Sequence, residues 1–311
     1  MSRVHDALRR AAVVPEQAVP EQSAPIPARP SAPSAGAVTA SAVASPPLET
    51  PTRARSLVGV LDRVRSVNYT PLKDSLLIDV TKPHQGPTEE FRSLRTRLNH
   101  MQTLQPIHSI VVTSASPAEG KSFTAANYAI AQSQLAGNPT VLCDFDFRRP
   151  MVHTFFQIDR SPGITDYLLG KAELQDVIVR IKDTNLYLMP AGEAVINPLE
   201  LLNLDEVKTL IDDLPGLFNW VVMDTPPLLF AADANLLSTM SHGTILVVRI
   251  GNTTIDSVTR AMQSLCQNNV LGIVVNGARR GELYSKYTYY HSYYDGVDPA
   301  QASEQVTPED E

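Results

Sequence analysis

The stretch Ile110-Val-Val-Thr-Ser-Ala-Ser-Pro-Ala-Glu-Gly-Lys-Ser122 decides the fold. An apolar run typical of a buried strand leads into a loop of small residues, which closes with Gly-Lys-Ser before a helical pattern that begins near Phe123. In this context, called a P-loop, backbone N–H groups at the start of a helix surround a phosphate, and the helix dipole favours its negative charge. Ala115 and Ala118 replace glycines that are usual in such loops, and the alternative is an ordinary helix N-terminus.

The loop predicts a site for ATP and Mg²⁺. Lys121 is expected to reach the β- and γ-phosphates, and the hydroxyl of Ser122 is expected to bind Mg²⁺. The residues expected to line the nucleotide are Ala118, Glu119, Gly120, Lys121, Ser122 and Phe123.

A second segment, Thr140-Val-Leu-Cys-Asp-Phe-Asp-Phe-Arg-Arg-Pro150, carries two carboxylates at the end of a predicted strand. Asp144 and Asp146 are two residues apart and therefore on the same side of the strand. The carboxyl ends of parallel strands are where such folds bind ligands. The alternative is a solvated strand end whose acids are neutralised by the arginines that follow.

A third segment, Trp220-Val-Val-Met-Asp-Thr-Pro-Pro227, is an apolar strand that ends in Asp224. An aspartate in this position can hold Mg²⁺ or one of its waters. Taken alone, the segment favours a strand end that begins a proline turn. The order and spacing of the three segments favour a phosphoryl-transfer site instead.

From about residue 87, apolar runs alternate with helical patterns. The runs are His108–Val112, Thr140–Cys143, Leu186–Met189, Trp220–Met223, Thr244–Val248 and Gly272–Val275. The helical patterns are Pro87–Met101, Ser122–Leu135, Asp205–Leu214, Ala231–Met240 and Asp256–Asn268. This alternation predicts an α/β fold with a mostly parallel sheet covered by helices on both faces. Residues 56–80 are ambiguous and are compatible with a helix followed by a short strand at Leu76–Val80.

The pattern divides the 311 residues into four regions. Residues 1–12 are expected to form a short helix, and residues 13–55 a disordered Pro/Ala-rich linker, because dense prolines remove backbone donors and block helices. Residues 56–283 form the predicted P-loop domain, and residues 284–311 a flexible tail that is rich in tyrosine and then acidic.

Charge and hydropathy exclude several classes of protein. The formal net charge of −7 argues against a nucleic-acid partner, whose binding surface is normally basic. No apolar run approaches the roughly 18 residues of a membrane span, and the charged start of the chain lacks the apolar region of a signal peptide. Cys143 and Cys266 have no metal-ligand spacing. We therefore expect a reduced, cytoplasmic protein.

Together the three segments resemble the bacterial tyrosine kinases, also called polysaccharide-biosynthesis tyrosine autokinases. The resemblance covers roughly residues 86–294 and rests on Glu119-Gly-Lys-Ser122, Asp144-x-Asp146-x-Arg148-Arg-Pro150 and Asp224-Thr-Pro-Pro227. The short helix before a Pro-rich linker is similar to the stand-alone cytoplasmic members. The resemblance implies a P-loop NTPase fold of the MinD/ParA-like type.

The resemblance also implies ATP-dependent phosphorylation of tyrosine, with Lys121, Asp144 and Asp146 as catalytic residues. Asp144 is the carboxylate expected to accept the tyrosine proton, although its division of labour with Asp146 stays open. Mg²⁺ is expected to be held by Ser122, Asp146 and Asp224. Phosphoryl transfer depends mostly on positioning and charge neutralisation, which these residue types can supply.

Two further motifs fit this family. Glu89-x-x-Arg92-x-x-Arg95 matches the family's oligomerisation motif and implies a homo-oligomer, the alternative being a solvated helix face with local pairs at i,i+3. Six of the ten tyrosines form a C-terminal cluster, and a nucleic-acid stacking surface would have more basic neighbours. We expect autophosphorylation in trans at Tyr284, Tyr287, Tyr289, Tyr290, Tyr293 and Tyr294.

The process that the resemblance implies is regulation of exopolysaccharide or capsule biosynthesis and export. The implied partners are the cytoplasmic segment of a membrane-spanning co-polymerase protein, which would hold the chain at the inner membrane, and a phosphotyrosine phosphatase. Two alternatives stay open, a MinD/ParA-type ATPase and an ATP-binding scaffold of an export complex. The MinD/ParA family has an extra lysine early in its P-loop, where Ser116 stands here.

Overall fold

The computed structural model describes residues 59–71, 77–79, 88–265 and 270–278. All of them belong to one compact unit, Arg55–Glu311. The expected helix at 1–12, the expected linker at 13–55, the tyrosine tail at 284–311 and Cys266 lie outside the described residues.

One sheet carries the phosphate-binding loop. Within the described residues its strands are β1 (Arg65–Val67), β2 (Ser109–Ser114), β3 (Thr140–Asp144), β4 (Val179–Ile181), β5 (Leu186–Met189), β6 (Trp220–Asp224), β7 (Gly243–Arg249) and β8 (Val270–Asn276). Their order across the sheet is β1-β4-β5-β3-β6-β2-β7-β8. All neighbours are parallel except β4 and β5. The prediction of a mostly parallel sheet is therefore confirmed.

The helices follow the strands along the chain. They are α2 (Thr88–Leu104), α3 (Lys121–Ser133), α4 (Val152–Phe156), α5 (Ile164–Leu168), α6 (Leu174–Val177), α7 (Pro198–Leu202), α8 (Asp205–Asp213), α9 (Asp233–Met240) and α10 (Ile255–Ser264). Two short 3₁₀ turns, η1 (Leu61–Arg63) and η2 (Leu214–Gly216), complete the described elements.

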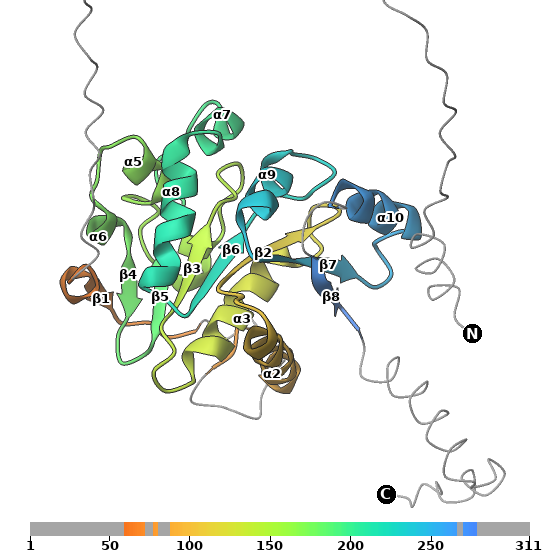
Figure 1. Ribbon diagram of the computed structural model, residues 1–311, viewed down its shortest axis with the longest axis horizontal. Coiled ribbons are helices and arrows are strands. Elements are labelled where there is room, and N and C mark those ends of the chain that lie inside the picture. The colour runs from red at the N-terminus through yellow and green to blue at the C-terminus, as the bar shows by residue number, and fades with distance from the viewer. Residues whose placement is uncertain (1–58, 72–76, 80–87, 266–269, 279–311) are drawn as a thin grey trace, which may run out of the picture. The chain divides into compact units, whose positions relative to one another are not determined.

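Alternating side chains of the buried strands divide the core between the two faces of the sheet. In β6, Val221 and Met223 pack in a cluster with residues of α5 to α9, whereas Trp220 and Val222 pack in a cluster with residues of α2, α3 and α4. Figure 1 shows α2 and α3 together on one side of the sheet and α8 on the other. Helices therefore cover both faces, as predicted.

The topology brings the three sequence segments together. The chain passes from β2 through α3 to β3, but β6 lies between these two strands. Asp224 at the end of β6 stands in register with Val112 of β2 on one side and with Asp144 of β3 on the other. The P-loop after β2 and both acidic segments consequently meet at one edge of the sheet.

The structure of residues 56–80 differs from the helix and strand with which the sequence was compatible. The described part contains η1 and the three-residue strand β1, and Leu77–Asp79 form no strand. The segment is fixed instead by a side chain, because the backbone N–H of Ile78 donates to Asn127 Oδ1 at 2.8 Å. β1 and β4 were also not predicted, since three residues are too few to show a strand pattern.

Candidate active site

The P-loop joins the end of β2 to the start of α3. Gly120 precedes the helix with φ 96°, and Ala118 has φ 62°, so one glycine and one alanine adopt left-handed backbone. Ala118 is exposed on the loop, as a residue facing a ligand should be. Phe123 points elsewhere: its ring lies edge-on to Phe91 of α2, with 6.0 Å between ring centroids. The ring packs between the two helices, so a contact of Phe123 with the nucleotide stays a prediction for its backbone N–H in the first turn of α3.

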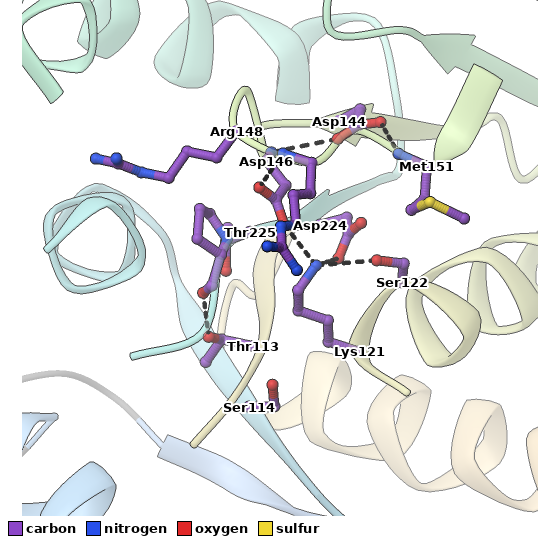
Figure 2. A network of polar contacts seen from close by, with 12 residues as sticks. Thr113, Ser114, Lys121, Ser122, Asp144, Asp146, Arg148, Met151, Asp224 and Thr225 are labelled. Carbon is purple, nitrogen blue, oxygen red and sulfur yellow. Dashed lines mark hydrogen bonds and ion pairs between the residues drawn. The ribbon is translucent and has the colours of Figure 1, made fainter. Parts of the chain in front are cut away.

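Lys121 lies at the centre of a polar cluster (Figure 2). Its Nζ lies 2.7 Å from Asp146 Oδ2, 3.0 Å from Ser122 Oγ and 3.6 Å from Asp224 Oδ1. Burial lowers the pKa of Lys121, but the carboxylates of Asp224 and Asp146 outweigh this effect and raise that pKa above its ordinary value. The ammonium group therefore stays charged across the physiological range.

Asp224 is a fully buried carboxylate with unused oxygens. Neither Oδ1 nor Oδ2 accepts a hydrogen bond from the residues that the structure describes. Burial raises the pKa of Asp224 to about 6, although the neighbouring side chains of Lys121 and Ser122 oppose the rise. The ion pair with Lys121, at 3.6 Å, offsets only part of the cost of burying this carboxylate, so a further positive charge would stabilise it.

These side chains fit a magnesium ion. Mg²⁺ in nucleotide sites takes one or two carboxylates together with phosphate oxygens and water. Asp224, Asp146 and the Ser122 hydroxyl supply that set around Lys121. In the described part of the chain, no group of three His, Cys, Asp or Glu side chains could hold a metal by itself. An ion here would accordingly need phosphate or water to complete its coordination.

Asp144 has different surroundings from Asp146, although both come from the same strand end. Its Oδ2 accepts the N–H groups of Met151 and Val152, each at 2.9 Å, and its Oδ1 accepts that of Asp146 at 3.2 Å. Burial is the largest cause, ahead of the nearby Asp224, of a pKa well above the ordinary value for Asp144, and the Val152 N–H opposes it. The structure thus directs Asp144 towards the start of α4, while Asp146 faces Lys121.

Arg148 connects this loop to α9. Its guanidinium forms two hydrogen bonds with the buried carboxylate of Asp233, at 2.9 and 3.0 Å. A bidentate pair of this kind fixes geometry as well as charge. Sequence analysis did not single out Asp233, because nothing in the sequence relates it to a residue 85 positions earlier.

Glu119 was expected to line the nucleotide, but its side chain turns into the protein. Its Oε2 accepts the N–H of Ser116 at 2.9 Å, and its Oε1 accepts the hydroxyl of Thr253. Its backbone carbonyl accepts Asn276 Nδ2 at 2.9 Å. The backbone of Glu119 can still face a ligand, whereas its carboxylate, which is 1% exposed, holds the loop. Thr253 and Asn276 were missed because no local motif marks them.

The proposed oligomerisation residues form contacts within α2 and between α2 and α3. Arg92 Nη1 pairs with Glu89 Oε1 at 2.6 Å, three residues away on the same helix. Arg95 Nη1 donates to the carbonyl of Ala131 near the end of α3 at 2.7 Å. The structure contains one chain, so a role in assembly stays a prediction.

Comparison with known proteins places the chain in a family. No protein-family model matches it. The tyrosine-protein kinase YwqD of Bacillus subtilis is 33% identical over 216 residues, which is 69% of this chain and 90% of that protein. The tyrosine-protein kinase wzc of Salmonella typhimurium is 31% identical over 71% of this chain, a match that spans 31% of the longer protein.

None of the helices that the structure describes has the length and apolar character of a membrane span. Solved structures agree with these relatives. The kinase domain of Escherichia coli tyrosine kinase ETK is 30% identical, covers 69% of this chain and 84% of that chain, and has a TM-score of 0.62. The chimerical protein CapA2B2 is 31% identical over 68% of this chain and 92% of that one, with a TM-score of 0.61. The identity and coverage of these relatives show that this chain belongs to the bacterial tyrosine-protein kinases.

Proposed function

We propose that the chain transfers the γ-phosphoryl group of ATP to tyrosines, first of all to those at 284–294 of a neighbouring copy. The observation that carries the proposal is the position of Lys121 Nζ between the carboxylates of Asp146 and Asp224, beside the hydroxyl of Ser122. When a nucleotide binds, Lys121 can exchange its ion pairs with the two aspartates for phosphate oxygens, and the aspartates and the hydroxyl can then bind a metal ion.

In the proposed reaction, a tyrosine oxygen bonds to the γ-phosphorus while the bond from that phosphorus to the bridging oxygen breaks and ADP leaves. Lys121 and the loop amides neutralise charge on the transferred group and on the leaving oxygen. Bound Mg²⁺, held by Ser122, Asp146 and Asp224, would supply further positive charge at the phosphates. The phenolic proton passes to a carboxylate.

We propose Asp144 as the acceptor of that proton. Its pKa is raised by burial and by Asp224, which moves a carboxyl group towards the range useful to a general base at neutral pH. Its oxygens accept three backbone N–H bonds, two on Oδ2 and one on Oδ1, which leaves a lone pair of Oδ1 to take the proton. Asp146 is the alternative, and it is already paired with Lys121.

The process we propose is regulation of exopolysaccharide or capsule biosynthesis and export, on the strength of the family resemblance. A homo-oligomer would bring the tail of one copy to the site of the next. The cytoplasmic segment of a membrane-spanning co-polymerase would hold the kinase at the inner membrane, and a phosphotyrosine phosphatase would reverse the modification. A MinD/ParA-type ATPase or an ATP-binding scaffold would produce no phosphotyrosine.

A mixing experiment tests transfer between copies. One chain carries Lys121→Met and an intact tail; the other is active, but each of its six tail tyrosines is replaced by phenylalanine. With ATP, Mg²⁺ and the partner's cytoplasmic segment, we expect phosphotyrosine on the Lys121→Met chain only when both chains are present.

The matched control is Lys171→Met, which removes a lysine paired with Glu193 at an exposed site. This variant should keep its activity. A Lys121→Met chain that stays unmodified in the mixture, while the wild type labels itself, would refute transfer in trans.

A further inference from the structure

The backbone of the P-loop is held in a costly shape. Alanine at φ 62° is in the left-handed region, which is unfavourable for a residue with a Cβ atom. Gly120 at φ 96° is also left-handed. Because Ala118 stands where other P-loops have glycine, contacts from outside the loop must help to hold this shape.

Two carbonyl groups of the loop are held by β7 and β8. Arg249 Nη1 donates to the carbonyl of Ala118 at 3.0 Å, and Asn276 Nδ2 donates to that of Glu119 at 2.9 Å. In a trans peptide unit the C=O and the following N–H point in opposite directions. The N–H groups of Glu119 and Gly120 therefore point away from Arg249 and Asn276, and they donate no hydrogen bond within the described part of the chain.

The side chain of Glu119 ties the same loop to the turn after β7. It accepts the N–H of Ser116 across the loop and the hydroxyl of Thr253 from the turn. Thr253 Oγ1 also accepts the N–H of Arg249 at 2.9 Å. This bond links two residues that each contact the P-loop, Thr253 through Glu119 and Arg249 through Ala118. Glu119 thus fixes the loop internally and anchors it to the neighbouring strand.

The fit between Gly120 and Asn276 leaves no room for a side chain. A Cβ atom at Gly120 would lie 2.0 Å from Asn276 Nδ2. The loop therefore rests directly on the end of β8.

We propose that Arg249, Thr253 and Asn276 are positioning residues that hold the N–H groups of Glu119 and Gly120 ready for phosphate. The inference rests on the proposed function in one respect, namely that the P-loop binds a nucleotide. It extends that function by assigning the shape of the anion site to residues more than 125 positions later in the chain.

The test compares Thr253→Val, Thr253→Ser and the control Thr259→Val in the full chain. Valine keeps the shape of threonine and removes the hydroxyl, whereas serine keeps the hydroxyl. Thr259 is exposed on α10, where its hydroxyl donates to the carbonyl of Ile255 at 2.9 Å and has no other partner among the residues that the structure describes. For each protein, the affinity for fluorescent ADP in the presence of Mg²⁺ is measured by titration. KM for ATP, kcat and the unfolding midpoint are measured as well.

We expect Thr253→Val to weaken ADP binding about tenfold, the size expected for losing a hydrogen bond to a charged group. KM for ATP should rise similarly while kcat changes little. Thr253→Ser should restore wild-type affinity, and Thr259→Val should match the wild type throughout.

Asn276→Asp is the second variant and decides the question if Thr253→Val does not fold. It keeps the oxygen that accepts the N–H of Gly277 but places an acceptor against the carbonyl of Glu119, so ADP binding should weaken. Folded variants with wild-type ADP affinity, or with reduced kcat alone, would overturn the inference. Because ADP binding is measured without phosphoryl transfer, absence of kinase activity in the wild type would count against the proposed function only.

Discussion

The two ends of the central strands differ in how their polar groups are used. At the carboxyl ends, neither oxygen of Asp224 accepts a hydrogen bond from a described residue, and the Lys121 ammonium is shared among two acids and a hydroxyl. At the amino ends of β2 and β7, Ser109 and His242 bind each other: Nδ1 of the imidazole accepts the Ser109 N–H at 3.2 Å and lies 2.7 Å from its hydroxyl. At the end where ligands are expected, a buried carboxylate accepts no hydrogen bond, whereas at the amino ends Ser109 and His242 bind each other and the group without a described hydrogen-bond partner is the neutral hydroxyl of Thr244.

The largest expected effect comes from two aspartates in register at the same strand ends. Asp144→Ala should lower the free energy of unfolding by about 2–4 kcal/mol, because three backbone N–H groups, two of them in buried residues, lose their acceptor. Asp224→Ala removes a carboxylate that accepts no hydrogen bond from the described residues and whose ion pair with Lys121 is long, at 3.6 Å, so the loss at pH 7 should be smaller than for Asp144→Ala. Chemical unfolding of both variants measures the difference, and equal losses would contradict it.

Asp224→Ala should also change how the stability of the protein depends on pH. The pKa of Asp224 is raised to about 6 in the folded state, so the folded protein binds its proton more readily than the unfolded chain does. The stability contributed by this group is present at low pH and is lost as pH rises through about 6. The free energy of unfolding of Asp224→Ala, taken relative to that of the wild type, should rise by about 1–2 kcal/mol between pH 5 and pH 7.5. A constant difference over that range would mean that the carboxylate titrates normally.

The sequence predicts the carboxyl ends of the sheet better than its edges. β2, β3 and β6 are continuous runs of buried residues that each end in a polar residue, so both the strands and the meeting of Lys121, Ser122, Asp146 and Asp224 could be foreseen. β1 begins with two exposed residues and is only three residues long, which gives no strand pattern.

What could not be foreseen depends on distant contacts. The side chains of Asp144 and Asp146 have different partners because the N–H groups at the start of α4 bind Asp144, whereas Asp146 pairs with Lys121. Sequence spacing alone had placed both side chains on one side of the strand. The inward turn of Glu119 depends on Thr253, 134 residues later. Such contacts follow from the packing of whole elements, and no short motif encodes them.

A smaller effect is expected at the amino ends. Burial is the largest cause that lowers the pKa of His242, followed by His108, while Asp212 opposes it. Because Nδ1 accepts a backbone N–H, protonation of that nitrogen would break the bond to Ser109. A group with a lowered folded pKa stabilises above its unfolded pKa of about 6.5, and that stability is lost as pH falls below this value.

His242→Gln tests this expectation against His100→Gln, which changes an exposed histidine of α2. Wild type and the His100 variant should lose more stability than the His242 variant between pH 7 and pH 5.5. Parallel stability curves for all three proteins would show that His242 does not sense pH in this range.

The smallest effect within one chain is expected at Glu89 and Arg92, on α2. Their ion pair is local and exposed, so removing either side chain should change stability by only about 0.2–0.5 kcal/mol. Asp256 and Arg260 of α10 form a similar exposed pair at 2.6 Å, and its removal serves as the matched control.

If a second copy binds the α2 pair, the double Ala variant should move towards monomer in sedimentation and label its tail more slowly, whereas the α10 variant should do neither. Arg95 is kept intact because it holds the end of α3. Equal mass and equal labelling in both variants would assign the α2 pair to a solvated helix face.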